Sequence, residues 1–169
     1  NLSMLPVFKS INLGGVSSMS FQFIAPPAAQ KMYWRSSGDN SWSYKTNWQL
    51  DPVPGVGFSD RAPLPIDTLV FDDQSFPVSL NTVLVKNEVA YCGPMKWEGP
   101  FLAASMPELI IDNGGIMVNG GMQLHELMNV VSVGDNNRIV FISRESDIWK
   151  IRSAKKMFNM DLIINGSGE

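Results

Sequence analysis

Short runs of alternating apolar and polar residues follow one another along the chain, whereas a sustained helical period is almost absent. Most runs end in Gly, Asn, Asp or Ser, the residues that supply turn conformations. Short strands at about ten-residue spacing predict an all-β fold built as a sandwich, a barrel or a solenoid. The predicted strands cover residues 18–25, 67–72, 78–86, 108–113, 115–120, 130–135, 138–143, 147–153 and 161–166.

The best helical candidate is GGMQLHELMNV, residues 120–130. It places Leu124, Leu127 and Met128 on one face at helical spacing. We therefore expect one or two helical turns at this point in an otherwise all-β chain.

The C-terminal part of the chain separates strands by tight Asn-Gly and Gly-Asp corners, and it has no proline after Pro107. Strands with Ile, Val and Met on both faces fit a right-handed parallel β-helix, in which stacked coils bury a continuous interior. An antiparallel β-sandwich fits the periodicity almost as well. The composition alone favours neither, and the β-helix is the prediction that we carry forward.

The segment APPAAQK, residues 25–31, is typical of a linker. It divides the chain into residues 1–30, predicted to form N-terminal strands that act as a cap or end a preceding domain, and residues 31–169, predicted to form the β-helix-like module. The chain starts at Asn1 without a methionine and stops within a strand-like phrase. We therefore expect a piece of a longer protein, truncated at the C-terminus.

The composition and charge of the chain argue against some classes of function, namely nucleic-acid binding and membrane insertion. With 169 residues, 44% hydrophobic content and a net charge of −3, the chain can bury a sizeable core but offers no general attraction for nucleic acid or an anionic membrane. No apolar run reaches the ~18 to 20 residues that span a bilayer, so we expect no membrane insertion by this segment. The cluster Lys150, Arg152, Lys155 and Lys156 predicts a solvated strand edge.

The single cysteine, Cys92, excludes an internal disulfide. Its apolar neighbours predict a buried structural thiol. One histidine, His125, without a second His or Cys ligand makes no zinc site.

The stretch WRSSGDNSWSYKTNW, residues 34–48, holds three of the five tryptophans in a polar, Gly/Asn/Ser-rich segment. One hypothesis makes Trp34, Trp42 and Trp48 a lid over the first coil, because the end of a solenoid exposes unpaired strands and apolar interior. The other makes the three rings a platform for a glycan, with Asp39 and Asn47 as hydrogen-bond partners.

Carboxylates suggest two further sites. Asp67, Asp72 and Asp73 could bind Ca²⁺, which takes six to eight oxygen ligands, or could simply anchor turns around a strand. Asp112 and Asp135 could align on successive coils as a catalytic pair of the kind that cleaves polysaccharides. No local spacing brings two carboxylates together, so we predict no catalytic residues and no cofactor other than a possible Ca²⁺.

Three phrases in order carry a resemblance that covers about residues 33 to 168. The first is the tryptophan segment followed by Pro-x-Asp-x-x-Val-Phe-Asp, the second is CGPMKWEG, and the third is DIWKIRSAKKMFNMDLIINGSG. Together they resemble modules of large secreted surface proteins of the Bacteroidetes type, and the opening is similar to that of autotransporter-associated β-strand repeats. The residues that carry the first two phrases are Trp34, Gly38, Trp42, Asn47, Trp48, Pro65, Asp67, Val70, Phe71, Asp72, Cys92, Met95 and Trp97. The ten methionines of this chain depart from the family's pattern.

The resemblance implies an exported, extracellular or outer-surface protein with a β-helical build and an adhesin-like or structural role without catalysis. Its partners would be other domains of the same long chain, surface-assembly proteins or glycans. It also implies that Asp-Thr-Leu at residues 67–69 matches a short O-glycosylation motif of such proteins, with Thr68 as acceptor. Two alternatives remain open: a carbohydrate-binding or carbohydrate-cleaving module that uses the tryptophan loop, and a filament subunit whose DLIING strand pairs with a neighbouring chain.

Overall fold

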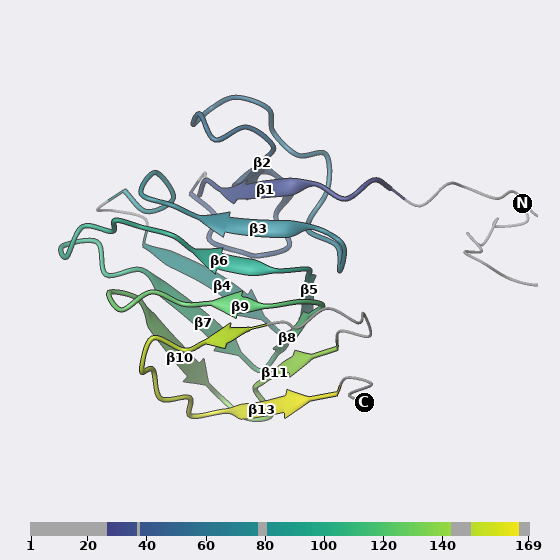
Figure 1. Ribbon diagram of the computed structural model, residues 1–169, viewed down its shortest axis with the longest axis vertical. Coiled ribbons are helices and arrows are strands. Elements are labelled where there is room, and N and C mark those ends of the chain that lie inside the picture. Colours follow the sequence, from purple (N-terminus) through teal and green to yellow (C-terminus); the bar gives the residue numbers. More distant parts are fainter. Residues whose placement is uncertain (1–26, 37, 78–80, 143–149, 166–169) are drawn as a thin grey trace, which may run out of the picture.

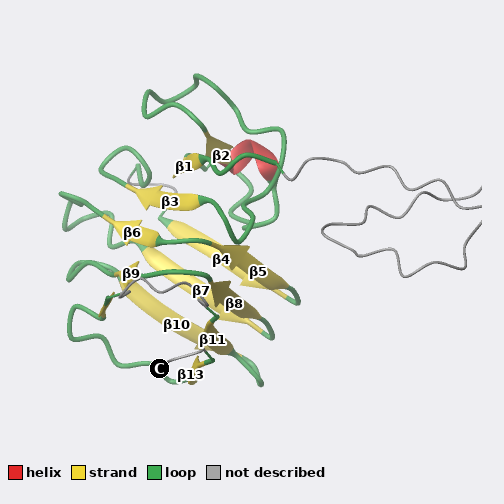
Figure 2. Cartoon of the chain, turned by 45° about the vertical axis from the view of Figure 1, so that its right-hand side comes forward, coloured by secondary structure: helices red, strands yellow, loops and turns green. Residues whose placement is uncertain are grey.

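The computed structural model describes residues 27–36, 38–77, 81–142 and 150–165. These residues form strands joined by turns, with one short 3₁₀ turn, η1 (Lys45–Asn47) (Figure 2). The strands are β1 (Lys31–Trp34), β2 (Trp48–Gln49), β3 (Thr68–Phe71), β4 (Thr82–Lys86), β5 (Val89–Cys92), β6 (Met95–Trp97), β7 (Glu108–Asp112), β8 (Gly115–Val118), β9 (Met122–Gln123), β10 (Asn129–Val133), β11 (Arg138–Phe141), β12 (Ile151–Arg152) and β13 (Asp161–Ile164).

The strands build three sheets that run along the stack of coils. Sheet A has the order β12-β9-β6-β3-β1-β2, sheet B the order β10-β7-β4, and sheet C the order β13-β11-β8-β5. Each complete coil gives one strand to each sheet, and every pairing is parallel except that of β1 with β2. The result is a β-solenoid of about three turns, which confirms the predicted β-helix and excludes the sandwich (Figure 1).

In-register parallel pairing stacks similar side chains on top of one another. In sheet C, for example, Ala90, Ile116 and Ile139 follow in register on successive coils, and all three are buried. In sheet B, Val83 lies beside Leu109. Because alternate residues of a strand face the same side, one apolar residue in two on each coil is enough to fill the interior.

The corners between sheets B and C repeat one backbone conformation. Asn87 and Asn113 directly follow β4 and β7 and have positive φ values of 52° and 50°. Asn tolerates this left-handed conformation better than most residues. The corner after β10 is two residues longer and has positive φ values at Gly134 (75°) and Asn136 (60°).

The predicted helix at residues 120–130 is wrong. Residues Met122–Gln123 form β9, which pairs in parallel with β6, and the following residues turn towards β10. Leu124 and Met128 are buried in the solenoid interior, so their spacing reflects two interior positions on one coil rather than a helical face.

Only part of the N-terminal predictions can be compared with the structure. The predicted strand 18–25 and most of the predicted N-terminal unit, residues 1–30, lie outside the described residues. Among the described residues, the first strand is β1, which begins at Lys31. In the part of the chain that the structure describes, no helix is long and apolar enough to span a membrane.

Candidate functional site

The tryptophan segment folds over the N-terminal end of the stack. Trp34 lies on β1 and Trp48 on β2, and the two residues pair directly across this antiparallel ladder. The loop between them contains η1 and carries Trp42, whose backbone N–H donates to the carbonyl of Leu84 at 2.8 Å. The segment is thus tied both to itself and to the first strand of sheet B.

The three indole rings form a buried cluster. Trp34 and Trp48 are 0% exposed and Trp42 is 2% exposed. Their ring centroids are 5.0 Å (Trp34–Trp48) and 5.2 Å (Trp42–Trp48) apart in edge-on geometry, and Trp48 Nε1 donates to the carbonyl of Trp42 at 2.8 Å. Trp34 and Trp48 also contact Phe71 of the first full coil. This burial confirms the lid, because the rings cover the interior that the first coil would otherwise expose.

The glycan platform loses its physical basis, since no ring face is open to a sugar. Its proposed polar partners also serve the loop itself. Asp39 accepts a hydrogen bond from the backbone N–H of Ser41 at 2.7 Å, and the buried Asn47 side chain donates to the carbonyl of Ser41 at 2.9 Å. These bonds hold the lid in shape.

Asp72 serves the lid as well. It accepts two hydrogen bonds from the buried Arg35 guanidinium, at 2.7 and 2.8 Å. The guanidinium also donates to the Ser75 hydroxyl at 3.0 Å, to the Pro52 carbonyl at 2.7 Å and to the Trp34 carbonyl at 2.7 Å. A two-pronged pairing of this type is geometrically specific. It fixes the long loop after β2 against the corner after β3.

Asp67 is fully buried and anchors a second junction. Its carboxylate forms an ion pair with Arg61 and accepts hydrogen bonds from the backbone N–H groups of Leu64, at 2.7 Å, and Gln30, at 2.9 Å. Burial pushes the pKa of Asp67 upwards, but the bonds from Arg61, Leu64 and Gln30 outweigh burial and leave the pKa below its usual value. The carboxylate is therefore charged and satisfied in the folded chain.

The three aspartates do not converge on a calcium site. Asp67 and Asp72 face different arginines, and Asp73 is exposed with Gln74 Nε2 at 3.2 Å from its carboxylate. Across the described ranges, no group of three or more His, Cys, Asp or Glu side chains is arranged to hold a metal ion. The alternative, in which these aspartates anchor turns around β3, accounts for their contacts.

The other sequence-predicted residues occupy separate places. Thr68 starts β3 and is half-buried, and its role as a glycosylation acceptor stays a prediction. Cys92 lies in the interior, where burial raises the pKa of its thiol, so its predicted burial is confirmed. Asp112 pairs with Lys86 at 3.1 Å, whereas its register partner on the next coil is Val133 rather than Asp135.

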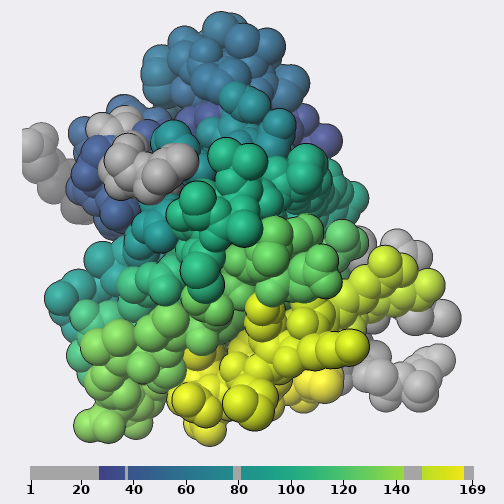
Figure 3. All heavy atoms as spheres, turned by 90° about the vertical axis from the view of Figure 1, so that its left-hand side faces the viewer, coloured from purple at the N-terminus to yellow at the C-terminus, as the bar shows by residue number. Residues whose placement is uncertain are grey.

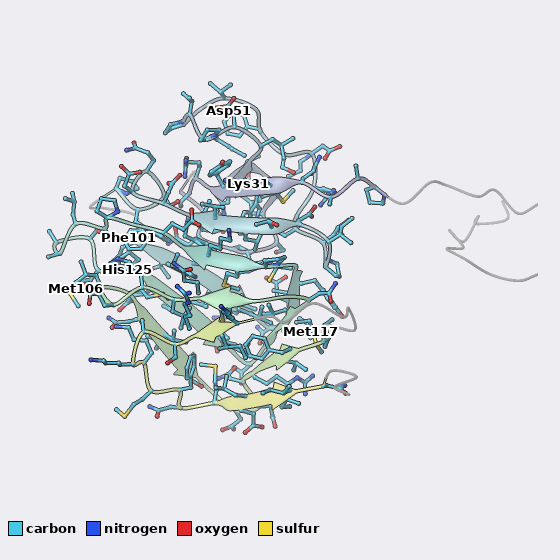
Figure 4. All side chains as sticks on the ribbon, viewed as in Figure 1. Lys31, Asp51, Phe101, Met106, Met117 and His125 are labelled. Atoms are coloured by element: carbon cyan, nitrogen blue, oxygen red, sulfur yellow. The ribbon has the colours of Figure 1, made fainter. Side chains whose placement is uncertain are left out.

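His125 lies at the edge of an interior aromatic row. Its ring is 4.9 Å from that of Phe101 in edge-on geometry, and the two labelled side chains lie together in Figure 4. Phe71 and Trp97 stack within the same row at 4.1 Å. The row joins the lid to the second coil.

Sequence reasoning missed Arg35 and Arg61 as the partners of the two buried or half-buried aspartates. Arg35 is 37 positions from Asp72, a distance at which no local pattern reports contact. The parallel pairing of β1 with β3 in sheet A brings the ends of these two strands together.

Comparison with protein-family models, with curated proteins and with solved structures finds no match to this chain. The resemblance to secreted surface modules of the Bacteroidetes type thus rests on the three sequence phrases.

Proposed function

We propose that this chain is a structural, non-catalytic module of an exported surface protein, a rigid spacer whose partners are other domains or surface-assembly proteins. The observation that carries this proposal is the difference between the two ends of the solenoid. One end is sealed by the tryptophan lid. The other end leaves the apolar interior uncovered by any described residue.

The open end is the last coil. Residues Cys92, Val118, Phe141 and Ile164 follow in register along sheet C; the first three are buried, whereas Ile164 is 77% exposed. The neighbouring interior row ends at Leu162, which is 45% exposed. Each sheet thus ends in a strand that has only one neighbour, and β13 lies at the opposite pole of the molecule from β1 and β2 (Figure 1).

Unpaired backbone groups and exposed apolar side chains at a sheet edge favour the addition of another strand. A further coil stacked on β10, β12 and β13 would bury both. A module that is closed at one end and stackable at the other is suited to building a long, stiff rod coil by coil.

A second candidate function follows from the same edge: a filament subunit, in which the added strand comes from another molecule. Sedimentation equilibrium of the purified chain separates the two candidates. The filament candidate requires a mass that rises with concentration and returns to that of one chain in the variant Leu162→Lys/Ile164→Lys. The spacer candidate requires one chain at all concentrations.

The location is tested on cells that produce the protein. Antibodies raised against residues 31–165 should label intact cells, and protease added outside should remove the label. Labelling that requires permeabilised cells would refute the surface role, whatever the state of association.

A further inference from the structure

The outer face of sheet A carries a hollow of about 280 Å³ that the preceding sections leave without a role. It lies across three neighbouring strands, β6, β9 and β12, near the open end of the stack. Figure 4 shows sheet A from this side, with Lys31 labelled near the other end of the same sheet. The hollow is lined by Pro94, Met95, Lys96, Gly121, Met122, Gln123, Lys150 and Arg152.

The hollow results from the strand register. Met95 and Met122 point into the core and are buried, so the residues on either side of each face outwards. Pro94 and Gly121 are the outward residues that precede them, and neither has a long side chain. Long side chains follow: Lys96, Gln123 and Arg152 are in register on successive strands and form one wall.

The lining is cationic. Lys96, Lys150 and Arg152 are exposed, in a chain whose net charge is −3. Among the described residues, the only ion pair that any of the three makes is Lys96 with Glu98, at 3.7 Å and with both side chains nearly half exposed. Such an exposed pair contributes little. The positive charge of the hollow is therefore available to an external anion.

The arrangement suits a chain of anionic groups better than one small anion. Neighbouring strands lie about 4.8 Å apart, so Lys96 on β6 and Arg152 on β12 are separated by roughly 10 Å at the backbone. Two anionic groups, one at each cation, fit this spacing without forcing the two positive side chains to converge against their mutual repulsion. Arg152 can hold such a group in a two-pronged bond, and the Gln123 amide between the two cations can bind a hydroxyl.

The lining argues against single-stranded nucleic acid as the occupant. Proteins that bind single strands stack the bases on aromatic side chains, and the residues that line the hollow include none. We propose that the sheet A hollow binds an acidic polysaccharide through carboxylate or sulfate groups on successive sugars. This inference stands on the charges and register of sheet A and does not depend on the structural role proposed above.

Binding is tested by calorimetry on the chain with polygalacturonate, heparin, neutral dextran and poly-dT as probes. At low salt, at least one of the two acidic polysaccharides should bind, dextran should not, and rising salt should weaken the binding. Polygalacturonate carries only carboxylates, so its binding shows that carboxylates are sufficient, whereas binding of heparin without polygalacturonate shows that sulfates are required. The variant Lys150→Glu/Arg152→Glu should lower the affinity about tenfold or more, because it removes two cations and the carboxylates that replace them repel the anionic ligand.

The control variant Lys45→Glu/Lys86→Glu changes the net charge by the same amount at exposed positions on η1 and on sheet B. It should keep most of the affinity, and both variants should remain folded, with a modestly lower melting temperature in the control because Lys86 pairs with Asp112. An equal loss in the two variants, equal or tighter binding of poly-dT, or no binding of either acidic polysaccharide would each overturn the proposal.

Discussion

At the N-terminal end, the Asp67 anchor and the tryptophan lid show how single buried residues stabilise the fold. Asp67 holds the segment before β1, the loop at Arg61 and the start of β3 through one carboxylate. A buried charge of this kind is tolerated only while its partners remain, because removing one leaves the charge desolvated and unpaired. The tryptophans stabilise this end by burying a large apolar area, and their rings pack edge-on to fill the end of the interior.

Arg61→Gln should destabilise the chain at pH 7 by about 3 to 5 kcal/mol, since Asp67 then keeps only its two backbone donors. The lowered pKa of Asp67 makes its stabilising effect complete above the unfolded value of about 3.9, and this effect is lost as the pH falls through the folded pKa. The difference between parent and variant should therefore shrink in acid. Urea unfolding at pH 7 and pH 3 measures it.

The control is Lys86→Gln, which removes the exposed pair with Asp112 and should cost less than about 1 kcal/mol. A constant difference between parent and Arg61→Gln across this pH range would contradict the role of Asp67.

Trp42→Ala should cost about 3 to 5 kcal/mol, because it opens a cavity in the lid. Tyr44→Ala, two residues away and 46% exposed, should change the unfolding free energy by less than about 0.5 kcal/mol. Chemical denaturation followed by tryptophan fluorescence gives both values. Similar small costs for the two variants would mean that Trp42 is not part of the lid.

At the scale of elements, the solenoid depends on corners as much as on strands. The corner asparagines turn the chain from sheet B into sheet C, and the residue after Asn113 shows how tight the turn is. A Cβ on Gly114 would lie 2.6 Å from the Glu88 carbonyl oxygen of the coil before. The corner can therefore pack against the neighbouring coil only if it has a small residue such as Gly114 and a residue that tolerates positive φ, such as Asn113.

Asn113→Ala should destabilise the chain by about 1 to 2 kcal/mol more than Asn113→Gly. Both variants lose the bond from the Asp135 N–H to the Asn113 side chain, so the difference isolates the cost of φ = 50° for a residue with a Cβ. Thermal unfolding of the pair measures this cost. Equal melting temperatures would show that the corner relaxes to an ordinary conformation.

The same elements show what the sequence could and could not foretell. Alternating runs such as ELIID located β7, because an interior-facing strand needs apolar residues at every second position. The two-residue strand β9 is too short to carry a period and was predicted as part of a helix, whereas β12 lies within the predicted strand 147–153. At the candidate site, the density of tryptophans signalled the lid, whereas the hollow on sheet A depends on which residues the register brings side by side. The basic cluster after Lys150 was predicted as a solvated edge, and β12 is indeed the last strand of sheet A with Arg152 exposed.

The whole molecule is a stack in which each coil contacts mainly the coils above and below it. The space-filling view in Figure 3 shows this order, with the colours passing in sequence from blue at the lid to yellow at the open end. In such a stack, stability is close to a sum of coil and interface contributions. A substitution should therefore cost less as its position approaches the open end.

Ile116→Ala and Ile164→Ala test this gradient with the same chemical change on the same sheet. Ile116 is fully buried and its loss should cost about 2 to 5 kcal/mol. Ile164 is largely exposed and its loss should cost less than about 0.5 kcal/mol in the isolated chain. Urea unfolding gives both values, and a large cost for Ile164→Ala would mean that the end is covered in solution.

Because the stack is closed by a lid at one end and open at the other, its coils can fold in a fixed order, starting from the lid. The lid and first coil are made before the rest of the described coils, and once folded they present a ready edge to each segment that follows. Coil after coil can then add to a preformed template, so that every step closes only a short loop and never waits for the far end of the chain. The asymmetry of the two ends therefore sets an order of assembly that matches the order in which the chain is synthesised.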